Sequence, residues 1–223
     1  RRFGLTQSDM DAMDLRASGR SVGGPEFVSA AFRNYPRLVV PLMSFSGVAR
    51  GAQGRDLSGQ CPGRWISLRN PQGHRWAQYG VIRGSGGYGV TLITEGPGDG
   101  LTAAAVGYDV VMVRGAALAG SDELVAEIAE GVRGTQVIAA GDADAAGEGF
   151  NRKLAEALKR HDIDVYQIEI PRLRKGSDLT DWRESCPEDF PRALHEAVKV
   201  AKRIEVGEPV IAEIVPQEEA ASA

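Results

Sequence analysis

The sequence has little cysteine, lacks long apolar runs and contains no lysine in its first 90 residues. Its two cysteines, Cys61 and Cys186, are far apart and belong to neither a Cys-x-x-Cys nor a Cys/His pattern. We therefore expect two reduced structural thiols and no structural zinc site. No apolar run approaches the roughly 18 residues that a membrane-spanning helix needs, and no signal peptide is visible. These absences favour a cytoplasmic protein.

Charge is divided unequally between the two halves of the chain. Residues 1–90 carry 12 arginines against 5 acidic residues, a net charge of +7, while residues 91–223 carry 14 basic and 25 acidic residues, a net charge of −11. This division indicates a basic half that contacts a polyanion and an acidic half that binds metal. The use of arginine alone is equally typical of a GC-rich genome, so the prediction rests on the charge division.

The first part of the chain predicts a small mixed α+β subdomain. Residues 3–35 are typical of helix and turn, and residues 37–82 contain short apolar segments separated by Gly, Pro and Asn, as in a meander of hairpins. The glycine-rich segment 84–89 is the expected domain boundary. The subdomain is therefore expected to span residues 1–88.

The rest of the chain predicts a parallel sheet with helices on both faces. Strand-like segments alternate with helical ones from residue 90 to residue 170, the pattern of an α/β fold. We expect this domain to span residues 89–186, with a C-terminal helix over 187–204. The acidic tail, residues 205–223, is expected to be disordered or a linker.

Acidic residues follow two of the expected strands. The segment LITEGPGDG (92–100) places Glu95 and Asp99 after one strand, and VIAAGDADAAG (137–147) places Asp142 and Asp144 after another. In open α/β sheets ligands bind outside the carboxyl ends of the strands. Carboxylates there suit Mg²⁺ or Mn²⁺ bound together with phosphates. Glu95 then serves as a metal ligand or as a general base, and the sequence leaves both roles open.

Each acidic residue also has a structural interpretation. Strict strand alternation would point Asp142 and Asp144 to opposite faces, so joint metal binding requires a bend in the loop. The Asp142/Asp144 pair could instead supply a helix N-cap and a first-turn acid, and Asp99 could cap or support its own helix rather than contact a nucleotide. Gly96, Gly98 and Gly100 allow either close approach of a phosphate or a simple flexible turn.

Arginine and tryptophan alternate in the basic part of the chain. Arginine makes bidentate contacts to phosphate, and aromatic rings can stack on unpaired bases. The alternative interpretation places both tryptophans in the core and the arginines on a solvated face. The candidate nucleotide- or DNA-binding residues are Arg55, Arg64, Arg69 and Arg75, with Trp65 and Trp76 between them.

With both acidic motifs placed on a βαβα core, the chain resembles the Toprim family, which includes DnaG-like primases, topoisomerases and some nucleases. The family pattern is a strand ending in Glu, matched by Glu95, and a later strand ending in Asp-x-Asp, matched by Asp142 and Asp144. EGPGD (95–99) is similar to the primase E-G-x-x-D motif, and GDADAAG (141–147) is similar to D-x-D-x-A-G.

The flanking segments resemble the primase branch of that family. RLVVPLMSFSGVARGAQGRDL (37–57) looks like the primase segment that ends in Gly-Arg, which implies a catalytic role for Arg55. RKGSDLTDW (174–182) looks like the family's later acidic element and implies that Lys175, Asp178 and Asp181 lie near the site. From the residues alone, Asp178 and Asp181 could equally cap a helix, with Ser177 as its N-cap.

The resemblance implies a DNA primase core that makes short RNA primers from NTPs on single-stranded DNA with Mg²⁺ or Mn²⁺. In this interpretation Glu95, Arg55, Asp142 and Asp144 are catalytic, and Glu95, Asp142, Asp144 and Asp178 hold the metal. A replicative helicase in cis or in trans is the expected further partner. Because the N-terminal subdomain is shorter than in the bacterial enzyme and neither a zinc module nor a helicase-binding domain flanks it, we expect an excised core or part of a phage or plasmid helicase–primase.

Two other functions remain open at this point. One is a Toprim nuclease or topoisomerase-like enzyme, although nothing marks Tyr35, Tyr79 or Tyr88 as a nucleophile. The other is a nucleic-acid-binding module without catalysis, against which the presence of Glu95, Asp142 and Asp144 argues.

Overall fold

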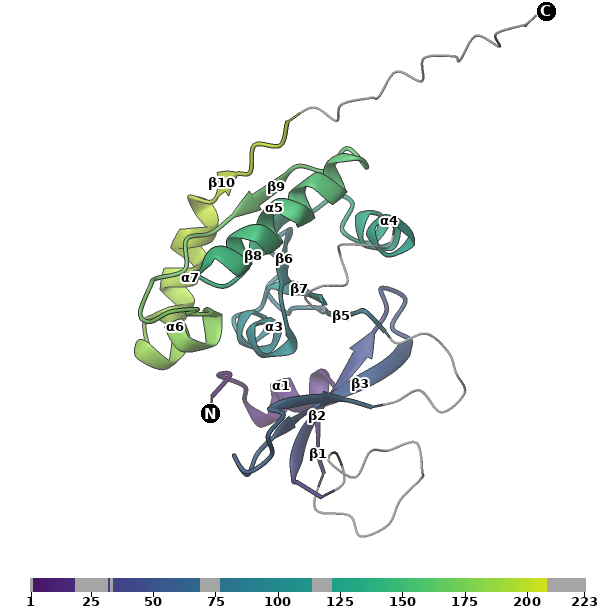
Figure 1. The fold of residues 1–223 in the computed structure, drawn as a ribbon, viewed down its shortest axis with the longest axis vertical. Coiled ribbons are helices and arrows are strands. Elements are labelled where there is room, and N and C mark those ends of the chain that lie inside the picture. The colour runs from purple at the N-terminus through teal and green to yellow at the C-terminus, as the bar shows by residue number, and fades with distance from the viewer. Residues whose placement is uncertain (1, 19–31, 33, 69–76, 114–121, 208–223) are drawn as a thin grey trace, which may run out of the picture.

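The computed structural model describes residues 2–18, 32, 34–68, 77–113 and 122–207. These residues form two β-sheets, with most of the helices packed around the second (Figure 1). The first sheet is antiparallel throughout, in the strand order β1-β2-β3-β4. Its strands are β1 (Arg16–Ser18), β2 (Arg37–Met43), β3 (Ala49–Asp56) and β4 (Trp65–Ser67), preceded by helix α1 (Gln7–Ala12).

The second sheet has the strand order β10-β9-β8-β6-β7-β5. Its four central strands run parallel, and the two outer strands, β5 and β10, pair antiparallel with their neighbours. The predicted parallel sheet is confirmed, with antiparallel edges added. The strands are β5 (Tyr79–Ile82), β6 (Val90–Thr94), β7 (Asp109–Val113), β8 (Gln136–Ala140), β9 (Val165–Gln167) and β10 (Lys202–Arg203).

Helices cover both faces of this sheet, as predicted. Successive strand residues point to opposite faces, so Leu92 packs into one core cluster and Ile93 into the other. Helices α3, α6 and α7 contribute to the first cluster, and α4 and α5 contribute to the second. Their bounds are α3 (Pro97–Ala104), α4 (Asp122–Gly131), α5 (Ala145–Lys159), α6 (Leu179–Ser185) and α7 (Phe190–Lys199).

The boundary between the sheets lies earlier in the chain than the glycine-rich segment. Strand β5 was expected in the first meander but pairs with β7 of the second sheet, because all four of its residues are buried there. The glycine-rich segment is not a free linker. The N–H of Gly84 donates to Asp109 (2.8 Å), and a Cβ at Gly84 would lie 2.2 Å from the carbonyl oxygen of Gly107. Glycine is needed here because two backbone segments touch.

The N-terminal region also differs from the expected helix and turn. Only residues 7–12 are helical in its first part, and β1 adds an edge strand to the first sheet. The second helix expected before Tyr35 lies mostly outside the described residues. Phe3, Val40 and Leu42 join the first core cluster of the second sheet, so one core connects both sheets. None of the described helices is both long and apolar enough to span a bilayer.

Candidate active site

Glu95 and Asp142 lie at the same edge of the second sheet. Strands β6 and β8 are parallel neighbours, with Thr94 paired to Ala140. Glu95 directly follows β6, and Asp142 follows β8 after one glycine. The sheet therefore brings the two acidic motifs together at the carboxyl ends of adjacent strands, as predicted.

The turn that carries Asp142 is packed closely against helix α5. A Cβ at Gly147 would lie 2.0 Å from the carbonyl oxygen of Asp142 and 2.4 Å from its nitrogen. The N–H of Gly141 donates to the side chain of Asn151, 2.9 Å away. The N–H of Ala143 donates to the carbonyl of Ser177 (2.8 Å), which ties the later acidic element to this turn. The chain bends here, as joint use of Asp142 and Asp144 requires.

Asp144 is the N-cap of α5, as the structural interpretation proposed. Its Oδ1 accepts hydrogen bonds from the N–H groups of Ala146 (2.9 Å) and Gly147 (3.0 Å). Its Oδ2 faces the 174–178 loop, since a Cβ at Gly176 would lie 2.9 Å from it. Capping therefore occupies one oxygen of Asp144, and the second one faces the acidic element.

The later acidic element contributes two carboxylates with different environments. Asp178, and not Ser177, is the N-cap of α6, and its Oδ1 accepts from the N–H of Asp181 (2.6 Å). Ser177 is fully buried and instead closes the turn by bonds to the backbone of Arg174. The guanidinium of Arg174 binds both oxygens of Asp181, at 2.9 and 2.5 Å. Asp178 stays available at the site, whereas Asp181 is neutralised.

The carboxylates repel one another strongly enough to change their proton affinity. Burial, together with the charges of Glu95, Asp178, Asp144 and Asp181, raises the pKa of Asp142 to about 7. Burial and Asp144 raise the pKa of Glu95. A cluster of half-buried carboxylates that destabilise each other's charge is stabilised by a cation. Among the described residues no three metal-binding side chains already form a closed cluster, but the oxygen donors fit a hard divalent ion.

A cavity of about 880 Å³ opens beside Asp142. It lies along the ends of β8 and β9, and its polar lining includes Asn151, Gln167 and Arg172. Pockets of about 300–1,000 Å³ are typical of small-molecule sites. Of the acidic cluster, Asp142 lines this cavity, which leaves room for a ligand beside that carboxylate.

Asp99 lies inside the protein, behind the acidic cluster. Its side chain is 7% exposed, and its Oδ1 accepts from the N–H and the hydroxyl of Thr180, both at 3.0 Å. This contact joins α3 to α6 beneath the site. Burial, followed by the charge of Asp178, holds the pKa of Asp99 well above its usual range. Asp99 thus supports the site from behind, and its contact with a nucleotide stays a prediction.

Asp99→Asn is expected to change how stability depends on pH. An unfolded aspartate loses its proton near pH 4, whereas folded Asp99 keeps it to a higher pH, so wild-type stability falls as pH rises from about 4 through the raised pKa. Asparagine accepts the same Thr180 bonds and has no proton to lose, so the variant should gain stability relative to wild type as pH rises. Urea unfolding between pH 5 and pH 9 measures this difference. Asp122→Asn, at an 88% exposed side chain, is the control, and a constant difference for Asp99→Asn would contradict the prediction.

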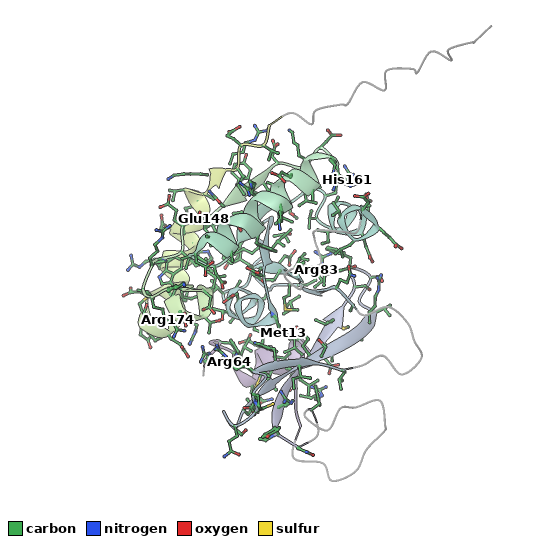
Figure 2. All side chains as sticks on the ribbon, viewed as in Figure 1. Met13, Arg64, Arg83, Glu148, His161 and Arg174 are labelled. Carbon is green, nitrogen blue, oxygen red and sulfur yellow. The ribbon has the colours of Figure 1, made fainter. Side chains whose placement is uncertain are left out.

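Arginines of the basic half lie opposite the acidic cluster. Arg55, on β3, is half-buried; burial and the nearby Arg2 and Arg64 lower its pKa, while Glu184 and Asp178 raise it. Arg64 is exposed and lies on the side where α6 faces the first sheet, as does Arg174 (Figure 2). Lys175 is exposed in the loop before α6. The tertiary structure therefore brings Arg55 of the first sheet near Asp178 of the acidic cluster.

Some predicted residues cannot be placed, and some contributors were missed. Arg69, Arg75 and Trp76 lie outside the described residues. Trp65 packs against the core cluster, in agreement with its core interpretation. Arg174 was not among the predicted site residues, although its position three residues before Ser177 could have indicated a contact with the later acidic element. Arg2 and Phe3 carried no signal, because only the packing of the N-terminus against α6 and β4 brings them here.

Comparisons with known proteins agree with this architecture. The Toprim domain family model matches residues 89–169. No curated protein matches the chain significantly.

Among solved structures, the chain is similar to the Aquifex aeolicus primase (zinc binding and RNA polymerase domains), with a TM-score of 0.67, 15% identity and coverage of 91% of this chain and 54% of that one. It thus spans about half of the Aquifex chain. The DnaG primase catalytic domain bound to ssDNA has a TM-score of 0.64, 15% identity and coverage of 91% and 70%. The primase fragment of the bacteriophage T7 primase-helicase protein has a TM-score of 0.58, 18% identity and coverage of 87% and 71%. Residues 89–169 therefore match the Toprim domain family, within a chain that has the fold of DnaG-type primase catalytic cores.

Proposed function

We propose that this chain is the catalytic core of a DNA primase, which joins ribonucleoside triphosphates into short primers on single-stranded DNA. The observation that carries the proposal is the position of Glu95 and Asp142 at adjacent strand ends, in an acidic cluster whose Asp178 lies near Arg55 of the first sheet. A site of this kind offers carboxylates for metal and a nearby cation for phosphate. Both are needed when a 3′-hydroxyl attacks an α-phosphate and pyrophosphate leaves.

The acidic residues are the proposed metal ligands. Glu95, Asp142, Asp144 and Asp178 offer the oxygen donors that Mg²⁺ and Mn²⁺ prefer. A divalent metal bound there would neutralise the charge that develops on the phosphoryl oxygens. Asp144 and Asp178 each give one oxygen to helix capping, which fixes their orientation. Arg174 forms an ion pair with Asp181, so this carboxylate is proposed to hold the turn and not to bind metal.

The remaining roles follow from charge and position. Glu95, whose pKa is raised by burial, either accepts the proton of the attacking hydroxyl or holds metal. Arg55, Arg64 and Lys175 are proposed to bind the triphosphate or the DNA backbone, as are Arg69 and Arg75 outside the described residues. The net charge of +7 in residues 1–90 supports template binding by that half.

The partners are proposed on the same basis. One similar structure is a primase catalytic domain bound to ssDNA, and another belongs to a primase-helicase protein. Single-stranded DNA is therefore the proposed template, and a replicative helicase, in cis or in trans, is the proposed neighbour. A cytoplasmic location would follow from such a role in replication.

Glu95→Gln is expected to abolish primer synthesis with little loss of stability. The substitution keeps the volume of the side chain but removes its charge, and loss of a metal ligand or general base costs on the order of 100-fold or more in rate. Dinucleotide formation and extension on single-stranded template with labelled NTPs and Mg²⁺ or Mn²⁺ measures this rate. Glu130→Gln, at a 79% exposed side chain on α4, is the matched control.

The same assay distinguishes the other functions. Metal-dependent cleavage of the DNA without any NTP-dependent product would replace the primase proposal by a nuclease or topoisomerase-like one. DNA binding with neither synthesis nor cleavage would indicate a binding module. Equal synthesis by Glu95→Gln and wild type would remove Glu95 from the mechanism.

A further inference from the structure

Arg55 lies against a pair of neighbouring aromatic rings at the boundary of the two sheets. The centre of its guanidinium is 5.3 Å from the centroid of the Phe3 ring and 5.6 Å from that of Trp65. The two rings are 6.4 Å apart and tilted by 39°. Within the described part of the chain, no hydrogen bond or ion pair reaches this guanidinium, so the rings are its main described contacts.

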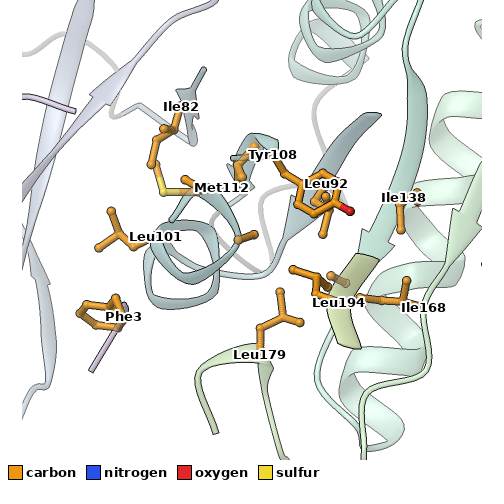
Figure 3. Packing of buried hydrophobic residues seen from close by; sticks show 14 of the residues in the cluster. Phe3, Ile82, Leu92, Leu101, Tyr108, Met112, Ile138, Ile168, Leu179 and Leu194 are labelled. Carbon is orange, nitrogen blue, oxygen red and sulfur yellow. The ribbon is translucent and has the colours of Figure 1, made fainter. Parts of the chain in front are cut away.

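Both rings are held firmly by the core. Phe3 is 7% exposed and belongs to the core cluster that contains Leu101 and Leu179 (Figure 3). Trp65 packs against the same cluster from β4, where it pairs directly with Arg55 of β3. Rings packed in this way restrict the side chain that lies against them.

The ring pair also lies near the first turn of helix α3, which begins shortly after Glu95. A Cβ placed on Gly98, three residues after Glu95, would lie 3.5 Å from Phe3 and 3.9 Å from Trp65. These are ordinary van der Waals distances. The two rings that contact Arg55 therefore also pack close to the start of α3, the helix that follows Glu95.

The charged residues around Arg55 explain why its packing against the rings matters. Arg55 is repelled by Arg2 and Arg64 and attracted by Asp178 and Glu184. Without a restraint, a flexible arginine so placed would pair with a carboxylate and neutralise a metal ligand. The negative face of an aromatic ring attracts a cation by about 0.5–2 kcal/mol, depending on exposure. Two such faces can hold the guanidinium away from the carboxylates while it keeps its charge.

We propose that Phe3 and Trp65 are positioning residues that hold Arg55, unpaired with the acidic cluster, in place for the triphosphate of an incoming nucleotide. The proposal rests on the function proposed above and deepens it, because it assigns the substrate specificity for a polyphosphate to a cation fixed by aromatic rings. Leucine at either position would fill most of the volume but has no negative face.

Trp65→Leu is expected to raise the KM for NTP by about 5- to 30-fold, with a much smaller change in kcat, because the lost cation–π attraction acts on substrate binding. Trp65→Phe keeps an aromatic face and should restore most of the affinity, and Phe3→Leu should resemble Trp65→Leu. The matched control is Phe45→Leu, which removes a ring 5.6 Å from Arg83, a cation paired with Asp109 on another part of the sheet. Its KM should equal that of wild type. Thermal unfolding of each variant monitors the fold.

A double-mutant cycle separates positioning from general packing. If the rings act through Arg55, Trp65→Leu added to Arg55→Ala should weaken NTP binding no further. Additive losses, or an unchanged KM in Trp65→Leu beside a raised KM in Arg55→Ala, would overturn the positioning role and leave the primase proposal intact. Equilibrium binding of ATP with Mg²⁺ is measured on the same variants, so the rings are tested even if the core does not polymerise. Failure of wild type to bind ATP would overturn both proposals.

Discussion

Gly147→Ala is expected to destabilise the protein, although the same change normally stabilises a helix. Alanine exceeds glycine in helix propensity by about 1 kcal/mol. At Gly147, however, the new Cβ would lie 2.0 Å from a backbone oxygen and 2.4 Å from a backbone nitrogen of Asp142, which cannot rotate away. Overpacking of this kind costs roughly 1–3 kcal/mol, and here the strain falls on a proposed metal ligand. We expect a loss of unfolding free energy and at least about a tenfold loss of primer synthesis, since small displacements of catalytic groups are costly.

Gly149→Ala is the control, because it lies in the same helix with nothing within 4 Å of its Cβ position. It should gain about 0.5–1 kcal/mol and keep full activity. Urea unfolding and the dinucleotide assay measure both variants. If both substitutions stabilised the protein equally, the result would contradict the close packing of the Asp142 turn on α5.

Arg37→Met is expected to have the largest effect on the first sheet. The side chain of Arg37 is fully buried, and it donates to the carbonyl oxygens of Phe32 (3.3 Å) and Gly54 (3.0 Å) and to the sulfur of Cys61 (3.0 Å). Its charge also helps to hold the pKa of Asp56 at about 2, together with hydrogen bonds from Ser58 and Cys61. Removing one partner of a buried charged network costs about 3–5 kcal/mol.

Thermal and urea unfolding measure this loss. Arg192→Met, at a 76% exposed side chain paired only with Asp189 among the described residues, should cost at most about 1 kcal/mol. The pKa of folded Asp56 lies below its unfolded value, so its stabilisation is present above about pH 4 and is lost as pH falls towards 2. Arg37→Met should weaken that acid dependence. A loss no larger than that of Arg192→Met would show that Arg37 is not a structural centre of the sheet.

Local patterns in the sequence were enough for the parallel sheet and for half of the site. Apolar segments of strand length, each followed by a helix, allow few arrangements other than an α/β sheet. Since carboxyl ends of parallel strands share an edge, Glu95 and Asp142 could be placed together without coordinates. The capping of α5 by Asp144 was also open to prediction, because the interactions of an N-cap are local.

The partners of strands and of charged side chains were not predictable in this way. Strand β5 has no charged residue and could join either sheet. It pairs with β7 of the second sheet, where all four of its residues are buried. Asp178, and not Ser177, caps α6, since Ser177 is occupied by the backbone of Arg174. Such choices depend on contacts between segments that are distant in sequence.

The sequence by itself determined which residue types stand at the proposed site, because residue type and strand position are local properties. The acidic residues at two strand ends and the basic N-terminal half could be recognised from the sequence alone. Only the tertiary structure decided which charges remain available. In the folded protein, Arg174 forms an ion pair with Asp181, and Asp99 is buried against Thr180. Arg55 lies on the rings of Phe3 and Trp65. Electrostatic and packing energies depend on distance and burial, and both arise only when the two sheets come together.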